Sequence, residues 1–472
     1  MIGSCAGAAV GGAFAQWLEL APLVPALAGT LAGIVASCLL LRRRLARALP
    51  VELDEWIHRR RKLRWLWAAC ALLAIVNTAR LGLFITDPDQ VWASAFPPVA
   101  ESAQHQCSGA YVRAGELAAE GHTNLWDPDD YAGDQPTSID GLAPYLGDEY
   151  VYPPPFAVLP RVAVAASHDY QLLRDLWFAI SAVGLLIAII AIAAWMRGRA
   201  GATMLLLVPA IVISFPVTLG LQFGQAHLLV VAASIAAMMQ FARGKTISGA
   251  TLLAFTISTK IFPGLLLVHL AVRRQWRQIA VTLVALAAMT VLAALVLGGD
   301  TLTAFVTEHV PRLASGDAFA FADTNPDNHS IYGIAFKLAT LGLTTASRDL
   351  AATLAWLWTA IAIVLTLRAS RLRGEPVRAN DVLLWLAIVC LATLRSPFAP
   401  SYTAIGTLWL MAVAVEVRGW PKALVAIAWV LLQGAPPMFG PASNVIASLP
   451  GQAITIAVAV MAAWPRAATH RS

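Results

Sequence analysis

The sequence predicts an all-α polytopic membrane protein, and three observations support this fold class. Of the 472 residues, 58% are hydrophobic and only 13% are charged, against about a quarter charged in soluble domains. The mean hydropathy is +0.68. Apolar runs of about 20 residues recur, which is the length that crosses ~30 Å of hydrocarbon as a helix. We expect a bundle of roughly 11 to 13 transmembrane or re-entrant helices with a large first extracytoplasmic loop.

The expected spans are continuously apolar, as segments buried in lipid or in a bundle must be. They cover 22–41, 65–85, 176–196, 202–219, 228–241, 279–297, 350–367, 382–394, 402–417, 423–438 and part of 442–464. The stretch 248–272 breaks the alternation, because cytoplasm-favouring Lys245 and Arg273 flank it. We expect two half-helices that meet near Lys260 and Pro263, since proline breaks helices. The alternative is that 228–241 is the incomplete crossing.

Basic clusters between the apolar runs predict the orientation. The net charge of +6 is divided among short clusters, so we expect a membrane protein without a nucleic-acid partner. The clusters are 42–47, 59–64, 197–199, 243–245, 273–277, 368–378 and 418–422. Placing them in the cytoplasm leaves two long polar segments outside, 86–174 and 300–348. Loops of this length are commonly functional.

A pair of carboxylates, Asp87 and Asp89, follows the second expected span, with Arg80 about one helical turn inside it. Either carboxylate is a candidate base that removes a proton from a hydroxyl, since partial burial tunes such a group. The alternative is that the Asp-Pro-Asp sequence simply ends the helix in water, because these residues favour turns.

The first outer segment also alternates aromatic rings with carboxylates. Trp126, Asp127 and Tyr152 are candidate sugar-binding or acceptor-binding residues, because sugars stack on rings and their hydroxyls need acceptors. Trp and Tyr also gather at membrane interfaces without any ligand, which is the competing interpretation.

Cations in apolar surroundings predict an anion site. Lys260 interrupts an apolar stretch, and charge at membrane depth is costly enough to indicate function. With Arg395 and Arg80 it could hold a phosphate, although snorkelling to the interface is the alternative for Arg395. His329 in the second outer segment could bond to the same phosphate. It has no second His or Cys at metal-ligand spacing, so we expect no metal.

Taken together, four stretches resemble glycosyltransferase family 87, the polyprenyl-phosphate-mannose-dependent mannosyltransferases of the GT-C class. They are Tyr-Val-Tyr-Pro-Pro at 150–154, Gly-Gln-Ala-His at 224–227, Lys-Ile-Phe-Pro at 260–263 with Arg-Arg-Gln-Trp at 273–276, and Asn-His-Ser-Ile-Tyr-Gly at 328–333. Ser-Pro at 396–397 resembles a fifth. The resemblance adds Gln225 and Asn328 to the candidate sugar-binding or acceptor-binding residues.

The resemblance implies inverting transfer of a hexose, with mannose first, from a polyprenyl-phosphate donor to a lipid or glycan hydroxyl. It implies no cofactor beyond the lipid-linked donor, and a site on the outer face of a bacterial cytoplasmic membrane. An N-terminal helix and basic linker at 1–63 would precede a GT-C-like catalytic domain at 64–472. The sequence departs at Cys107, where the resemblance implies an acidic base. Asp87 or Asp89 is then the expected substitute.

Two other functions compete with the transferase. A transporter or flippase of an anionic or lipid-linked substrate would also need broken helices and buried charges. A non-catalytic scaffold would explain why Cys107 stands where the resemblance implies an acidic base. No inverted repeat stands out in the sequence, and the polar residues concentrate in the outer segments, so we favour the transferase.

Overall fold

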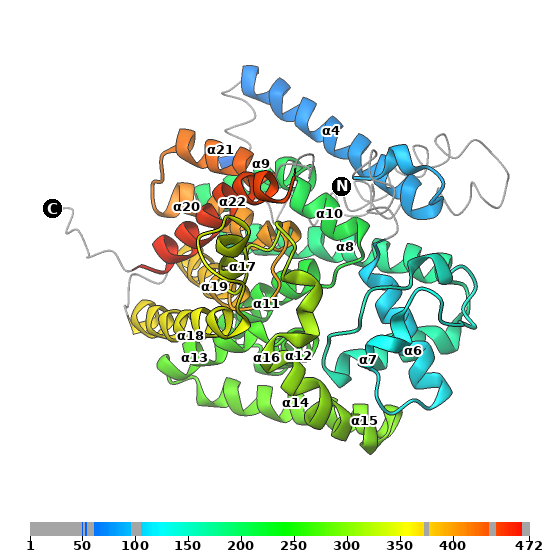
Figure 1. The fold of residues 1–472 in the computed structure, drawn as a ribbon. Helices are drawn as coiled ribbons and strands as arrows, with labels where there is room; N and C mark the ends of the chain where they lie inside the picture. Colours follow the sequence, from blue (N-terminus) through cyan, green and yellow to red (C-terminus); the bar gives the residue numbers. More distant parts are fainter. Residues whose placement is uncertain are drawn as a thin grey trace.

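The structure is a computed structural model that describes residues 50, 52–53, 61–95, 105–371, 377–433 and 440–464, with the side chains of 61–63 and 322 left aside. The expected first span at 22–41 and the basic cluster at 42–47 lie outside these residues. The described residues form helices joined by loops, and their one β-type pairing is an isolated bridge between Asp140 and Asp169. Figure 1 shows the helices gathered into a bundle, with α6 and α7 beside it.

Thirteen helices build the described part of the bundle. Their bounds are α4 (Arg61–Thr86), α8 (Tyr170–Met196), α9 (Gly198–Val212), α10 (Phe215–Gln222), α11 (His227–Ala242), α12 (Thr246–Thr259), α13 (Leu265–Val272), α14 (Trp276–Leu297), α18 (Arg348–Arg371), α19 (Arg378–Thr393), α20 (Ile405–Val417), α21 (Lys422–Leu431) and α22 (Pro441–Ala463).

The two outer segments and the connections hold shorter helices. These are α6 (Cys107–Glu120), α7 (Pro154–Ala166), α15 (Gly299–Ala304), α16 (Val310–Ser315) and α17 (Gly333–Thr340), with single turns η1 (Val91–Ala93), η2 (Pro128–Tyr131), η3 (Ala143–Tyr145), η4 (Phe262–Gly264), η5 (Phe305–His309), η6 (Asp317–Ala322) and η7 (Ser401–Ala404).

The all-α polytopic class is confirmed. Among the described residues five helices are long and apolar enough to cross a membrane: α4 from Arg64, α8, α14, α18 and α22. Helices α9 and α10 form a sixth candidate span, bent by 59°. Large apolar side chains on α14 are open to the surroundings, with Leu295 79% and Val284 69% exposed. Such a surface is compatible with lipid and incompatible with water.

The expected break at Lys260 is also confirmed. Helix α12 ends at Thr259, and Lys260 takes an extended backbone (φ −142°, ψ 128°) before the turn η4 and helix α13. Pro263 lies in that turn, where its ring does not interrupt a helical hydrogen bond. The break presents Lys260 between two helices instead of within one.

The centre of the bundle is formed by α11, α19 and α20. Nearly every residue of α20 is buried, including Trp409 and Leu410. A helix that is apolar all round is one surrounded by other helices. The loops at the ends of these three helices, which carry polar residues described below, are therefore anchored in the bundle core.

Helices α6 and α7 form the framework of the first outer segment (Figure 1, cyan and teal). Gly115 on α6 lies so close to α7 that an added Cβ would be 2.5 Å from the carbonyl oxygen of Pro160. On the other side of α6, buried Glu116 accepts hydrogen bonds from Arg113 (2.7 Å) and Thr137 (2.9 Å). The segment is therefore a packed unit attached to the bundle.

The turn between α10 and α11 depends on Gly224, whose φ is +62°. Its carbonyl accepts a hydrogen bond from the Trp177 indole at 2.6 Å, and a Cβ there would lie 2.8 Å from that of Ser108. Only glycine takes this backbone conformation without strain. The turn therefore brings Gln225 and the start of α11 against the start of α6.

Candidate active site

A buried polar cluster lies where the first outer segment meets the bundle. We call Cys107, Tyr111, Tyr152, Gln225 and Tyr402 the Gln225 cluster. The Gln225 amide oxygen accepts from the Tyr152 hydroxyl at 2.7 Å, and its nitrogen donates to the Tyr402 hydroxyl at 3.0 Å and to the Cys107 sulfur at 3.2 Å. The Tyr111 and Tyr152 hydroxyls are 2.9 Å apart. Four separate elements therefore converge on one amide.

Lys260 lies beside the Gln225 cluster. Its ammonium is 5.1 Å from the centre of the Tyr152 ring, a cation–π contact. Among the described residues no carboxylate lies within ion-pair distance of this ammonium. A cation in apolar surroundings without a counter-charge favours binding of an anion.

His227 opens α11 next to Lys260. Its ring lies 5.1 Å from that of Phe262 and 6.3 Å from that of Tyr402. The side chain is buried, and its Nε2 atom has no hydrogen-bond partner among the described residues. Buried polar atoms are rarely left unpaired, so this nitrogen is a candidate contact for a ligand. His227 belongs to the motif at 224–227 but was not predicted from the sequence as a site residue.

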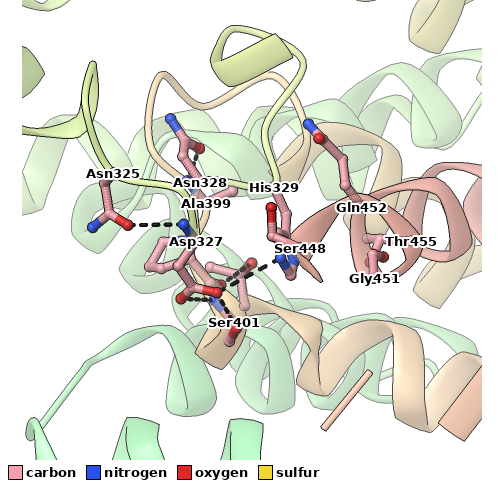
Figure 2. Close-up of polar contacts among 12 residues, drawn as sticks. Asn325, Asp327, Asn328, His329, Ala399, Ser401, Ser448, Gly451, Gln452 and Thr455 are labelled. Atoms are coloured by element: carbon pink, nitrogen blue, oxygen red, sulfur yellow. Dashed lines mark hydrogen bonds and ion pairs between the residues drawn. The ribbon is translucent and has the colours of Figure 1, made fainter. Parts of the chain in front are cut away.

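A second group of polar residues, around Asp327 and His329, is linked to the Gln225 cluster by the consecutive residues Ser401 and Tyr402. Tyr402 belongs to the cluster, whereas the backbone nitrogen of Ser401 donates to the Asp327 carboxylate at 2.9 Å and its hydroxyl bonds to the same group. We call 325–330 the His329 loop. Figure 2 shows His329 between the Asp327–Ser401 pair and Gly451 of α22.

The His329 loop is held by its own backbone and side chains. Asn328 donates to the Pro397 carbonyl at 2.8 Å, and its oxygen accepts from the backbone of Ala399 at 3.1 Å. The backbone of His329 donates to the Ala399 carbonyl at 2.9 Å. Asn328 therefore fixes the position of the loop.

The His329 side chain is buried, with Nε2 3.6 Å from the Asp327 carboxylate and Nδ1 without a hydrogen-bond partner among the described residues. Burial lowers the pKa of this imidazole to about 4, Asp327 opposes that shift and Lys337 adds to it. At neutral pH the ring is therefore uncharged, and it can offer one N–H donor to a ligand.

The structure places Asp87 and Asp89 in the turn after α4. Asp87 accepts hydrogen bonds from the backbone of Asp89 (3.2 Å) and from the Gln90 amide (3.0 Å). Asp89 is exposed and lines a cavity of about 710 Å³ with Tyr145 and residues around it. In the described residues neither carboxylate has a contact with Lys260 or the Gln225 cluster.

Arg80 and Arg395 contact residues other than those that surround Lys260. Arg80 donates to Asn77 on its own helix at 3.1 Å. Arg395 donates to Thr359 at 2.9 Å and lies 5.0 Å from the ring of Trp356, an exposed residue of α18. The structure thus brings Lys260, Tyr152 and Gln225 together but gives the two arginines partners of their own.

Trp126 and Asp127 line a second cavity, of about 250 Å³, between the two outer segments. Its other lining residues are Asn124, Pro128, Glu308, His309 and Arg312. The Trp126 indole stacks on His309 with ring centres 5.4 Å apart and donates to the Tyr152 carbonyl at 3.0 Å. The cavity is therefore one residue away from the Gln225 cluster.

Sequence reasoning missed three residues beside Cys107 and within the cluster: His105, Asp148 and Tyr402. Ligand-type atoms of His105, Cys107 and Asp148 lie within 4.8 Å of one another. His105 Nδ1 and an Asp148 oxygen are 2.8 Å apart, which is a hydrogen-bond distance, so the structure shows a bonded pair. The sequence signal that could have identified this group is the His-Gln-Cys run at 105–107, which places two reactive side chains two residues apart.

The family model described as glycosyltransferase family 87 matches residues 150–397, more than half of the chain. The matched part contains Tyr152, Gln225, Lys260 and His329. No curated protein and no solved structure matches the chain.

Proposed function

The chain belongs to glycosyltransferase family 87, and from this premise we propose which sugar transfer it performs. It is an integral membrane glycosyltransferase. We propose that it transfers a hexose, with mannose as the first candidate, from a polyprenyl-phosphate donor to a hydroxyl of a lipid or glycan. The anomeric configuration is inverted, and the architecture is of the GT-C class.

The observation that carries this proposal is the environment of Lys260. Its ammonium rests on the Tyr152 ring without a carboxylate partner in the described structure, at the break between α12 and η4. A lipid-linked sugar leaves its phosphate with a growing negative charge. A fixed cation in an apolar site stabilises that charge more than water would.

The groups around Lys260 suit the donor sugar and phosphate. His227 has a buried nitrogen without a hydrogen-bond partner among the described residues. The Tyr152 and Tyr402 hydroxyls lie nearby, and both bond to the Gln225 amide. From the adjoining His329 loop, the uncharged His329 ring is proposed to donate a hydrogen bond to the phosphate. Because these groups supply both charge and donors, the proposed transfer needs no metal ion or other cofactor.

The outer face of the cytoplasmic membrane is the proposed side of the reaction. Helix α11 begins at the site with His227 and ends beside Arg243, and α20 follows Tyr402 and ends beside Arg418. Helix α12 runs the other way, from Lys245 to Lys260. Basic residues thus lie at the helix ends opposite the site, as the positive-inside rule requires for an outward-facing site.

The acceptor is proposed to enter over the 250 Å³ cavity that Trp126 and Asp127 line. Aromatic rings and carboxylates around a cavity suit a sugar, because its apolar faces pack on rings and its hydroxyls donate to carboxylates. The Trp126–Tyr152 hydrogen bond ends beside the proposed donor site, so an acceptor in this cavity would have its hydroxyl near the sugar that it receives.

Transfer from radiolabelled polyprenyl-phosphate mannose tests the proposal, with purified protein in lipid nanodiscs and a bacterial membrane-lipid extract as acceptor. We expect a labelled glycolipid or glycan, and the same rate in EDTA. The product's anomeric configuration identifies inversion. Protein that binds no polyprenyl-phosphate mannose, glucose or arabinose, or that moves the donor across a vesicle bilayer without transfer, would contradict it.

A further inference from the structure

An ion pair at the start of α6 is not explained by the donor site alone. His105 Nδ1 lies 2.8 Å from one Asp148 oxygen, and the other oxygen accepts from the backbone of Gln106 at 3.0 Å. The imidazole also packs edge-on against Phe223, with ring centres 4.5 Å apart. The ring is therefore fixed by a carboxylate on one side and an aromatic face on another.

The pair adjoins the Gln225 cluster through Cys107. The sulfur accepts from the Gln225 amide at 3.2 Å, and it lies within 4.8 Å of a ring nitrogen of His105 and of a carboxylate oxygen of Asp148. The same amide bonds to Tyr152, over which Lys260 lies. The imidazole and the ammonium thus lie at different sides of one hydrogen-bonded cluster.

The two ends of that arrangement differ in exposure. The His105 side chain is 40% exposed and that of Asp148 21%, whereas Tyr152 and Gln225 are buried. An acceptor hydroxyl arriving from outside the bundle can therefore reach the imidazole. The carboxylate at Nδ1 selects the neutral tautomer that carries its proton on Nδ1 and its lone pair on Nε2, as in the His–Asp arrangement of hydrolases.

We propose that His105 is the catalytic base that removes the proton from the acceptor hydroxyl and that Asp148 is its positioning residue. This inference rests on the proposed function. The hydroxyl proton passes to His105 Nε2 as the acceptor oxygen bonds to the anomeric carbon. The bond from that carbon to the phosphate oxygen breaks, and its electron pair leaves with the phosphate beside Lys260. The imidazolium then releases its proton to water.

The pair also predicts how the rate depends on pH. Burial alone would lower the pKa of His105, but Asp148, with a contribution from Cys107, raises it well above its usual value. Within the part of the chain that the structure describes, these are the two titratable groups that face the ring, and Phe223 on the third side is uncharged. Because the base acts only when deprotonated, the rate should rise with pH and level off on the alkaline side.

The test separates donor binding from proton removal. Three quantities are measured in nanodiscs: binding of labelled polyprenyl-phosphate mannose, its slow hydrolysis by water, and transfer to octyl α-mannoside. Hydrolysis needs the same base without a particular acceptor. We compare His105→Ala, His105→Gln and Asp148→Asn with His122→Ala, which changes an exposed histidine paired with Asp130 in the same outer segment.

We expect His105→Ala and His105→Gln to lower hydrolysis and transfer at least 100-fold while the donor Kd stays within twofold. Asp148→Asn should lower both rates about 10-fold or more and move the midpoint of the pH profile to lower pH, because the group that raises the pKa of His105 is lost. His122→Ala should behave like the wild type, and retained donor binding shows that each variant is folded.

Four results would overturn the assignment. They are rates within threefold of wild type for both His105 variants, an unmoved pH profile in Asp148→Asn, loss of wild-type hydrolysis in EDTA, or selective loss of both rates in the double variant Asp87→Ala, Asp89→Ala. A wild-type protein that does not bind the donor removes the proposed function itself, and the inference with it.

Discussion

The hydroxyl of Tyr152 donates to the side-chain oxygen of Gln225 at 2.7 Å, although 73 residues separate them in the chain. This bond joins the first outer segment to the start of α11. The same amide nitrogen reaches Tyr402, so one buried side chain holds three elements together. The geometry of the site therefore depends on residues that no single motif contains.

Gln225→Leu should keep the shape of the side chain and remove all of its hydrogen bonds. The Tyr152 and Tyr402 hydroxyls would then be buried without that partner, at a cost of about 1–3 kcal/mol. We expect sugar transfer to fall about 10- to 100-fold, measured with labelled donor. Gln275→Leu, at a half-buried position before α14, should retain the wild-type rate, and equal rates in both variants would contradict a role for Gln225.

Lys260→Met should weaken donor binding and keep the apolar stem of the side chain. Hydrogen bonds to charged groups contribute about 1.5–3 kcal/mol, so the Kd for polyprenyl-phosphate mannose should rise about 10- to 100-fold. Free polyprenol, which carries no phosphate, should bind both proteins alike. Lys422→Met, with a side chain 80% exposed at the opposite end of the bundle, is the matched control. An unchanged Kd in Lys260→Met would remove the phosphate assignment.

His329 should make the protein less stable in acid. Its pKa is lowered to about 4 by burial, whereas the unfolded chain has a His pKa of about 6.5. As the pH falls from about 6.5 to about 4, the unfolded state takes up a proton that the folded state refuses, so stability is lost across this window. His329→Gln should show a smaller drop in melting temperature between pH 7.5 and 4.5. His122→Gln should retain the wild-type drop.

Gly224→Ala should disturb the turn that positions Gln225. A positive φ costs an alanine about 1–2 kcal/mol, and the new Cβ would lie 2.8 Å from that of Ser108. Gly244 also has a positive φ (+75°), but nothing lies within 4 Å of its added Cβ. Gly244→Ala therefore reports the backbone strain alone. We expect Gly224→Ala to melt at a lower temperature than Gly244→Ala and to lose transfer, and equal melting temperatures would show that the contact with Ser108 is unimportant.

Much of the fold could be predicted from sequence because hydrophobic runs and basic clusters are local signals. The break at Lys260 was predictable for the same reason, since a proline and a charge interrupt an apolar stretch within a few residues. The meeting of Tyr152, Gln225 and Lys260 was only implied by the resemblance. Sequence cannot show which buried partners a side chain finds across the bundle.

The proposed base, His105, was the hardest residue to predict from the sequence. Asp87 and Asp89 attract attention because two carboxylates follow a span, yet hydrogen bonds within a turn account for Asp87. His105 and Asp148 are 43 residues apart in sequence and look unrelated until folding of α6 against the following loop brings them to 2.8 Å. Their pairing is a tertiary contact, and no local pattern encodes it.

Tyr152 touches both sides of the proposed reaction, because its carbonyl accepts from Trp126 while its ring carries Lys260. A substrate that shifts this residue from one side therefore changes the free energy of binding on the other. Such coupling is reciprocal: the factor by which donor strengthens acceptor binding equals the factor by which acceptor strengthens donor binding. The enzyme would then select a donor and an acceptor as a pair. A donor that binds without an acceptor would bind less tightly than in the ternary complex, and less of it would be hydrolysed by water.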